Sequence, residues 1–184
     1  MEFEGLKIIK PVNMRRNAIT SRYHDLRMWG VHGGTDFAPI KPKKMPMKEF
    51  LKLLQNHPEH VYASSAFGEE VVKIEREPNG FGLYAKTLVI DYPIYLYYAH
   101  LQDVYVEKGQ ILKQQQIIGL MGNTGNCRSR WGGDGTHLHH EGRRQYHRDR
   151  HKSINLEWYY KDNTLEELYP AEKREYGKLR YRDE

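Results

Sequence analysis

Short apolar runs, separated by turn residues, dominate the middle of the chain. They are rich in Val, Ile, Leu and Tyr and are bounded by Gly, Pro or Asn: residues 61–66, 70–76, 83–90, 95–100, 117–121 and 137–141. Runs of this length and composition predict β-strands. Residues 2–10, which mix β-branched and charged side chains, predict an edge strand. Many short strands with few helices predict a mainly β fold with an antiparallel sheet core.

A helical pattern interrupts the strands between residues 41 and 60. Apolar residues recur at positions i, i+3, i+4 and i+7 of one segment: Met47, Phe50, Leu51 and Leu54. This spacing predicts one apolar face of a helix, which ends before Pro58. Near the end of the chain, Asn163 precedes a turn with two acidic residues and predicts a second, short helix.

Length and composition favour one globular domain. At roughly 100–200 residues per domain, we expect the 184 residues to form one domain over residues 1–160, followed by the short helix and a charged tail over residues 161–184. A single cysteine excludes an internal disulfide framework and a Cys-rich zinc module. The mean hydropathy of −0.84, without an apolar run of about 18 residues, excludes a membrane span. The first twenty residues lack the apolar segment of a secretory signal peptide.

The charge of the chain narrows the classes of partner. There are 29 Lys and Arg residues against 24 Asp and Glu residues, a formal net charge of +5, and the basic excess lies toward the two ends. A duplex-binding protein gathers its basic and aromatic residues on one element, so we expect no specific nucleic-acid partner. The positive charge does predict a general attraction to polyanions.

Histidines stand in three recognisable settings. His32 and Asp36 are separated by three residues in a Gly-rich segment, His32-Gly-Gly-Thr-Asp36. His100 ends an aromatic run, and His137 and His139 alternate with an apolar residue. Each pattern alone occurs by chance, and a lone strand histidine is usually a surface or core residue. Together, and in this order, they indicate a functional site.

The alternation of His137 and His139 has a direct geometric consequence. In a strand both rings point to the same face, roughly 6–7 Å apart. Zn²⁺ prefers imidazole nitrogen and carboxylate oxygen, and a catalytic site leaves one position for water. His32, Asp36 and one histidine of the pair would supply three ligands. Zinc would lower the pKa of water toward about 7 and polarise a carbonyl, while the remaining imidazoles would carry protons.

These segments resemble the M23 metallopeptidases, the lysostaphin/LytM-like peptidoglycan endopeptidases. The resemblance covers about residues 17–160. The matching segments are the Ser, aromatic and Arg run at residues 21–27, His32-Gly-Gly-Thr-Asp36 (HxGxD), Tyr98-Ala-His100-Leu101 (YxHL), the glycine-spaced residues 106–125, His137-Leu-His-His-Glu141 (HLHFE) and residues 153–159.

The resemblance implies a role for each residue of the motifs. It implies one Zn²⁺ per chain, held by His32, Asp36 and His139. It implies catalytic imidazoles at His100 and His137, and leaves open which of them is the general base. It also implies a two-sheet antiparallel β core of the LytM/lysostaphin type, with the zinc ion in a groove.

The chain departs from the family pattern in two segments. Residues 41–60 are an insertion, and we expect its helix to pack on the domain surface; the alternative is a wall of the groove. The loop before His137 is longer than the family turn and carries Arg128, Arg130 and Trp131, which are ordinary loop residues or substrate contacts. Cys127 in this loop is interpreted as incidental. His140 replaces the common Phe and, by alternation, should face away from the metal.

Two further assignments concern binding. Tyr23 stands where some members of the family place an aromatic hydroxyl near the groove, so it is a candidate substrate contact. Residues 143–152 form a basic run that is either a solvated loop or a patch for anionic wall polymers.

The combined features predict a zinc endopeptidase that hydrolyses peptide cross-bridges or stem peptides of bacterial peptidoglycan. Such a bacteriolytic enzyme acts on the cell wall, on the extracellular or periplasmic side, and is expected to be a monomer. Without a signal peptide, release of the phage endolysin type or excision from a longer protein fits the sequence. The alternatives are a degenerate M23-fold binding or activator module, and a phage virion-associated component that opens the wall.

Overall fold

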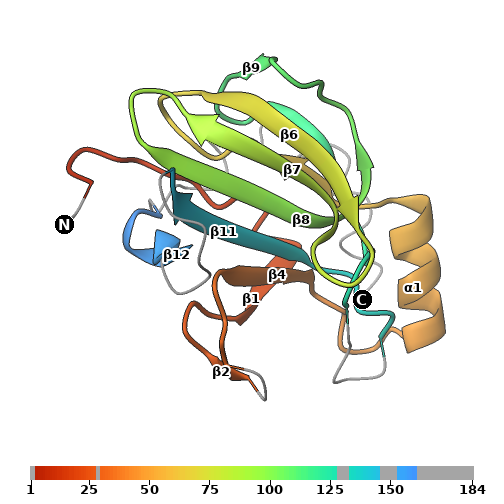
Figure 1. Cartoon of the computed structure of the whole chain (residues 1–184). Helices are drawn as coiled ribbons and strands as arrows, with labels where there is room; N and C mark the ends of the chain where they lie inside the picture. Colours follow the sequence, from red (N-terminus) through yellow and green to blue (C-terminus); the bar gives the residue numbers. More distant parts are fainter. Residues whose placement is uncertain (1–2, 28–29, 128–132, 146–152, 161–184) are drawn as a thin grey trace.

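The computed structural model describes residues 3–27, 30–127, 133–145 and 153–160. Within these residues twelve strands form two sheets, one of ten strands and one of two, accompanied by one α-helix (Figure 1). The elements in chain order are β1 (Asn17–Ser21), β2 (Leu26–Arg27), β3 (Gly30–Val31), β4 (Thr35–Pro39), α1 (Met47–Asn56), β5 (His60–Tyr62), β6 (Glu69–Glu77), β7 (Gly82–Val89), β8 (Ile94–Val104), β9 (Ile111–Leu112), β10 (Ile117–Met121), β11 (Leu138–Arg144), β12 (Ser153–Ile154) and the 3₁₀ turn η2 (Leu156–Trp158).

The large sheet has the strand order β1-β4-β11-β8-β7-β6-β9. Strand β10 pairs with β5 and β8, β12 pairs with β11, and β2 with β3 forms the separate two-stranded sheet. Every pairing between these strands is antiparallel. The mainly β, antiparallel fold expected from the sequence is therefore confirmed. Strands β4, β11 and β8, which come from distant parts of the chain, lie side by side at the centre (Figure 1).

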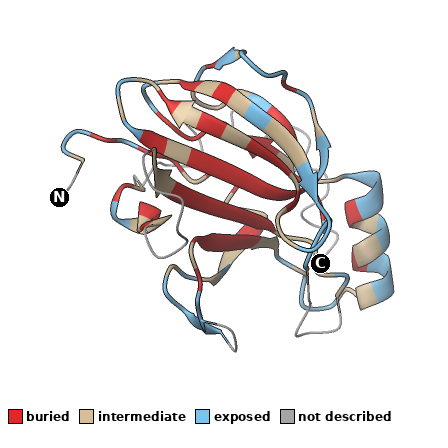
Figure 2. Cartoon of the chain, in the orientation of Figure 1, coloured by how far each residue is buried: buried red, intermediate tan, exposed pale blue. Residues whose placement is uncertain are grey.

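Strands β8 and β11 are buried along most of their length (Figure 2). On one face, Leu96 and Tyr98 of β8 and Leu138 of β11 belong to the main hydrophobic core. His140 lies on this face too, with its ring 4.9 Å from that of Tyr98. The opposite face carries His139, so alternation along β11 separates the two neighbouring histidines, as the sequence predicted.

Several predicted elements agree with the structure and others differ. The helix begins at Met47 and ends at Asn56, with Phe50 and Leu54 buried. The run at 61–66 is shorter than expected, because β5 ends at Tyr62. Residues 2–10 form no strand where they are described. Ile8 there makes isolated bridges to Ser65 and Tyr160, and its side chain is buried in the core.

Two expectations concern features beyond the sheet. The helix predicted after Asn163 lies outside the described residues. Among the described residues, no helix combines the length and apolar character needed to cross a membrane.

Candidate active site

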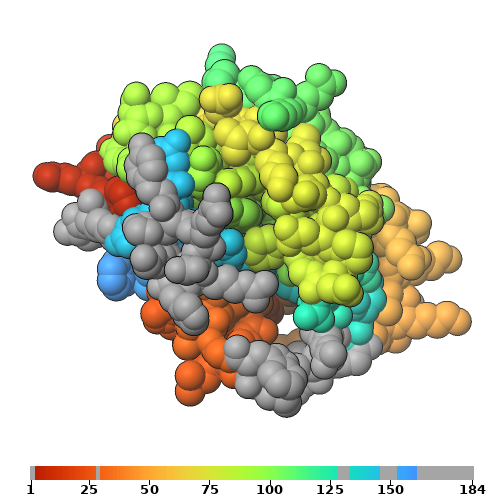
Figure 3. All heavy atoms as spheres, viewed as in Figure 1, coloured from red at the N-terminus to blue at the C-terminus, as the bar shows by residue number. Residues whose placement is uncertain are grey.

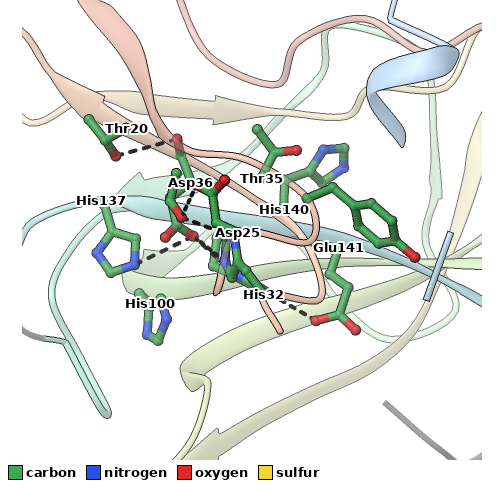
Figure 4. A network of polar contacts seen from close by, with 12 residues as sticks. Thr20, Asp25, His32, Thr35, Asp36, His100, His137, His140 and Glu141 are labelled. Carbon is green, nitrogen blue, oxygen red and sulfur yellow. Dashed lines mark hydrogen bonds and ion pairs between the residues drawn. The ribbon is translucent and has the colours of Figure 1, made fainter. Parts of the chain in front are cut away.

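Two neighbouring strands carry the residues at the centre of the site. Asp36 in β4 pairs directly with His139 in β11, and His139 also pairs with Ala99 in β8. His32 lies in the turn that leads from β3 into β4, and its ring reaches His139. Figure 4 shows His32, Asp36 and His137 grouped closely, with His100 beside them. Strand pairing thus brings together residues that are about 100 positions apart in the chain.

Close approach of the turn to β11 depends on glycine. A Cβ atom at Gly34 would lie 2.6 Å from the carbonyl oxygen of His140 and 2.9 Å from Cε1 of His139. Side chains do not pack at such distances without a shift of their surroundings. Gly34 of the His32–Asp36 motif therefore allows the backbone of the turn to approach that of β11.

Three ligand atoms point toward one another in this cluster. His32 Nε2 lies 3.0 Å from His139 Nδ1, and each of these nitrogens lies within 3.0 Å of Asp36 Oδ1. Three ligands bound tetrahedrally to zinc at the usual bond lengths would be about 3.3 Å apart. All three side chains are buried. The donor set and its spacing therefore fit a zinc ion.

The outward-facing atom of each ligand has its own hydrogen-bond partner. His32 Nδ1–H donates to the Arg22 carbonyl at 2.9 Å, and Arg27 donates to Asp36 Oδ2 at 2.8 Å. His139 Nε2–H donates to Glu141 Oε2 at 2.9 Å. Such contacts fix the tautomer and orientation of metal ligands. As a result, a lone pair of each group is directed into the cluster.

An ionised carboxylate, Asp36, lies at the centre of the cluster. Burial opposes ionisation of Asp36, but hydrogen bonds from His139 and His32 hold the pKa of its carboxyl well below the usual value. Burial likewise disfavours a charged His139, but hydrogen bonds to Asp36 and Glu141 raise its pKa to about 9. A proton is therefore held at the point where the three ligand atoms meet. A divalent cation can replace it with a larger electrostatic gain.

His100 and His137 form a second pair of imidazoles next to this cluster. Their ring centroids are 4.6 Å apart, and His137 Nε2 lies 3.9 Å from Asp36 Oδ1. His100 Nδ1–H donates to the Thr124 carbonyl at 2.9 Å, and His137 Nδ1–H donates to the Gly135 carbonyl at 2.7 Å. Because carbonyl oxygens only accept, both rings keep a lone pair on Nε2.

Burial keeps both of these rings neutral. It lowers the pKa of His100 to about 3, with the neighbouring His137 adding to the shift. It also lowers the pKa of His137, although Asp36 acts in the opposite direction. Neutral imidazoles with a free Nε2 can accept a proton from a reacting group.

The backbone of His100 is in an unusual conformation. Its φ of 65° lies in the left-handed region, which costs a non-glycine residue on the order of 1–3 kcal/mol. The sequence predicted His100 at the end of a strand, but β8 continues to Val104. The left-handed residue interrupts the regular alternation there, and the His100 amide donates to the Phe81 carbonyl at 2.8 Å.

Both histidine clusters open into one groove of about 980 Å³. Apolar side chains of α1 line it as well: Met47, Phe50, Leu51 and Leu54. Figure 3 shows α1, in light orange, projecting at one edge of the molecule. Residues 41–60 therefore contribute a wall of the groove, which is the alternative to the surface packing expected from the sequence.

A family model and solved structures identify relatives of this chain. The model of peptidase family M23 matches residues 55–155, more than half of the chain. The chain belongs to peptidase family M23. The matched range includes His100, His137 and His139, whereas His32 and Asp36 precede it. No curated protein sequence matches the chain.

Solved structures of the M23 fold resemble this one over most of its length. A zinc-containing peptidase from Vibrio cholerae is 25% identical over 84% of the chain, with a TM-score of 0.56. The antimicrobial peptidase lysostaphin from Staphylococcus simulans is 20% identical over 79%, with a TM-score of 0.59. The chain spans 40% and 50% of the length of these two proteins. A complex of SpoIIIAH and SpoIIQ shares the fold at 20% identity over 83%, with a TM-score of 0.57, and is covered over 99% of its matched chain.

The predicted substrate contacts are placed differently from the histidines. The Tyr23 hydroxyl donates to the Ser153 carbonyl at 2.7 Å, and its ring stacks on that of His24. Tyr23 is not among the described residues that line the groove. Arg128, Arg130 and Trp131 lie outside the described residues. Their loop does reach the groove, because Asp134 and Gly135 line it.

Sequence reasoning assigned no role to two charged residues that hold the ligands. Glu141 accepts from His139, and Arg143 Nε donates to its other oxygen at 2.6 Å. Arg27 pairs with Asp36. Alternation offered a signal for Glu141, since it is two residues from His139 and shares its face. The Arg27 contact had no such signal from alternation, although Arg27 belongs to the run at residues 21–27 that resembles the family.

Proposed function

We propose that this M23 domain is a zinc-dependent endopeptidase that hydrolyses peptide bonds of bacterial peptidoglycan. One observation supports it above all. A buried His–Asp–His ligand set and two neutral imidazoles open into the same groove. A module that only binds would need neither the ligand set nor the free Nε2 atoms.

The cofactor in this proposal is one zinc ion, bound by His32, Asp36 and His139. Zinc at this position would polarise the scissile carbonyl and lower the pKa of water toward about 7. The similar zinc-containing peptidase from Vibrio cholerae is in agreement with this choice. Glu141 and Arg27 keep the ligands oriented, and the buried cluster limits the access of bulk water.

His100 and His137 would handle the proton and the developing charge. One Nε2 accepts the proton of the attacking water and passes it to the leaving amine. The other would take up a proton as negative charge develops on the carbonyl oxygen, because that charge raises its pKa, and would then donate a hydrogen bond to the oxyanion through Nε2. Both rings are held by carbonyl acceptors on their Nδ1 side, so they need not reorient during the reaction.

The substrate in this proposal is a peptide cross-bridge or stem peptide lying along the groove. Anionic wall polymers would be attracted by the net charge of +5. The domain, assigned to residues 1–160, would act as a monomer on the outer side of the membrane. Arg128, Arg130 and Trp131 remain proposed substrate contacts, and Tyr23 remains one for a part of the substrate that extends beyond the groove lining.

The test is mass spectrometry of muropeptides released from purified cell walls with Zn²⁺ supplied. We expect release of peptide fragments that identify the bond cleaved, and no release by the His139→Ala variant. The control is His57→Ala, which changes an exposed histidine and should behave as the wild type. Binding to walls without any release would favour a non-catalytic module of the same fold.

A further inference from the structure

The single cysteine of the chain lies beside the two imidazoles proposed to act in catalysis. One ring nitrogen of His100, one of His137 and the Sγ atom of Cys127 lie within 4.8 Å of one another. This group is separate from His32, Asp36 and His139. From the sequence alone Cys127 has no expected role, since three other ligands are available for one zinc ion.

The backbone fixes the cysteine next to His100. The carbonyl of Thr124 accepts a hydrogen bond from His100 Nδ1–H at 2.9 Å and one from the Cys127 thiol at 3.4 Å. Gly125 adopts a φ of 79° between these two residues, a conformation that glycine adopts readily. The thiol and the imidazole are therefore anchored to the same main-chain atom.

The donor types in this group suit a soft divalent cation. Thiolate sulfur and imidazole nitrogen are preferred ligands of Zn²⁺, whereas Mg²⁺ and Ca²⁺ prefer oxygen. His100 and His137 each donate Nδ1–H to a main-chain carbonyl, which leaves Nε2 of both rings for a metal.

The thiol is protonated before a metal binds. Burial, together with the charges of Asp36 and Asp134, raises the pKa of Cys127 to about 12. The same two carboxylates that disfavour a thiolate attract a cation.

We propose that His100, Cys127 and His137 form a second metal site, specific for thiophilic divalent cations such as Zn²⁺ and Cd²⁺. A sulfur–metal bond forms, the S–H bond breaks, and the proton is released to solvent. The site is distinct from the His32–Asp36–His139 centre and is filled after it.

Occupation of the second site has a functional consequence. The metal uses the two imidazoles that would otherwise carry protons, so excess zinc inhibits the enzyme. This consequence rests on the proposed function, whereas metal binding itself does not.

The binding test uses the full chain, freed of metal and titrated with Cd²⁺. Formation of a cadmium–thiolate bond produces an ultraviolet charge-transfer band, which here reports on Cys127 alone because the chain has no other cysteine. We expect two bound equivalents, with the band appearing during the second. The Cys127→Ser variant should bind one equivalent and show no band. A wild-type chain without the band, or a Cys127→Ser chain that still binds two equivalents, would overturn the proposal.

An activity test separates this proposal from the proposed function. With one equivalent of zinc, wild type and Cys127→Ser should hydrolyse walls equally. With excess zinc, the wild type should lose most of its activity and the variant should keep it. If wild type shows no hydrolysis at all, the proposed function fails while the cadmium titration still decides the second site. Equal inhibition of both proteins would overturn the inhibitory role of the site.

Discussion

At the scale of single residues, hydrogen bonds to the main chain select one nitrogen of each imidazole. His32, His100 and His137 all donate through Nδ1 to a carbonyl oxygen, which leaves Nε2 unprotonated. His139 is reversed, because Glu141 accepts from its Nε2 and leaves Nδ1 facing Asp36. These contacts select, in each ring, the nitrogen that would bind metal or carry a proton.

The first prediction distinguishes His139, a proposed metal ligand, from His137 and His100, the proposed proton carriers. His139→Ala should lose stoichiometric zinc after dialysis, because it removes one of three ligands. His137→Ala and His100→Ala should retain zinc yet lose hydrolysis by roughly 10²–10⁴-fold, the effect of removing an acid–base group. Metal analysis and wall hydrolysis on the same samples test this. Full zinc retention by His139→Ala would move the third ligand to another residue.

The second prediction concerns Glu141, which contacts a ligand without facing the metal. Glu141→Gln should keep the hydrogen bond from His139 but weaken the polarisation of its ring, lowering zinc affinity roughly 10–100-fold. Competition with a chelator measures the affinity. The control Glu107→Gln changes an exposed carboxylate and should leave the affinity unchanged. Equal affinities for all three proteins would remove Glu141 from the metal centre.

The residues of the centre were predictable from the sequence to different degrees. The alternation of His137 and His139, and the outward orientation of His140, follow from strand geometry. The tautomers do not, because their acceptors are carbonyls of Arg22, Thr124 and Gly135, whose positions depend on the folded loops.

At the scale of elements, α1 places apolar side chains beside the proposed catalytic groups. Met47, Phe50, Leu51 and Leu54 line the same groove as His100 and His137. An apolar wall favours the side chain or methylene stem of a bound peptide, since contact removes apolar surface from water. We therefore expect α1 to act on substrate binding and not on the metal ligands.

The third prediction tests this role with two leucines of α1. Leu51 lines the groove, whereas Leu53 is similarly half-buried but is not among the described residues that line it. Leu51→Ser should raise KM and lower kcat/KM about tenfold, which corresponds to about 1.4 kcal/mol. Leu53→Ser should leave both constants near the wild-type values, and zinc content should be unchanged in both variants. Steady-state kinetics on a soluble cross-bridge peptide gives both constants. An equal effect of the two substitutions would mean that α1 has only a structural role.

The helix and most strands of the large sheet were visible in the sequence, but their arrangement was not. The apolar spacing that predicted α1 could not show which surface its exposed side chains would face. The pairing of β4 with β11 joins residues more than 100 positions apart. No local pattern encodes such a contact, although the glycine at 34 stands where another backbone approaches.

At the scale of the whole molecule, a buried carboxylate joins the strands behind the active site. Glu69 of β6 is fully buried and accepts hydrogen bonds from the Ser64 and Ser65 amides and from the hydroxyls of Thr87 and Tyr98. These groups belong to β7, β8 and the segment after β5. Because Tyr98 is also stacked against His140, the network supports the strands that carry the histidines.

The fourth prediction is that Glu69→Ala lowers the free energy of unfolding by roughly 3–5 kcal/mol, since it leaves buried donors without an acceptor. Its neighbour Glu70 is only half-buried, and Glu70→Ala should change the stability by less than about 0.5 kcal/mol. Urea denaturation followed by circular dichroism gives both values. Similar losses for the two variants would show that the network adds little.

The fifth prediction concerns the pH dependence of stability. Burial raises the pKa of Glu69 above 4.5, although its hydrogen bonds oppose this. Between 4.5 and the raised pKa the unfolded chain binds fewer protons at this residue than the folded chain, so stability falls as pH rises. Glu69→Gln keeps an acceptor and removes the titration. Compared with this variant, the wild type should lose stability as pH rises from about 4.5; parallel pH profiles of the two would contradict the raised pKa.

The proposed metal ligands Asp36 and His139 lie on directly paired strands, whereas the segments proposed to contact the substrate are connections between strands. The distance between these two groups is set by two adjacent strands, which lie about 4.8 Å apart in any sheet. The α1 wall and the loop before His137 are instead connections, whose length can change without altering that spacing. We therefore expect that transplanting residues 41–60 into another M23 domain would change its bond preference and leave its metal ligands unchanged.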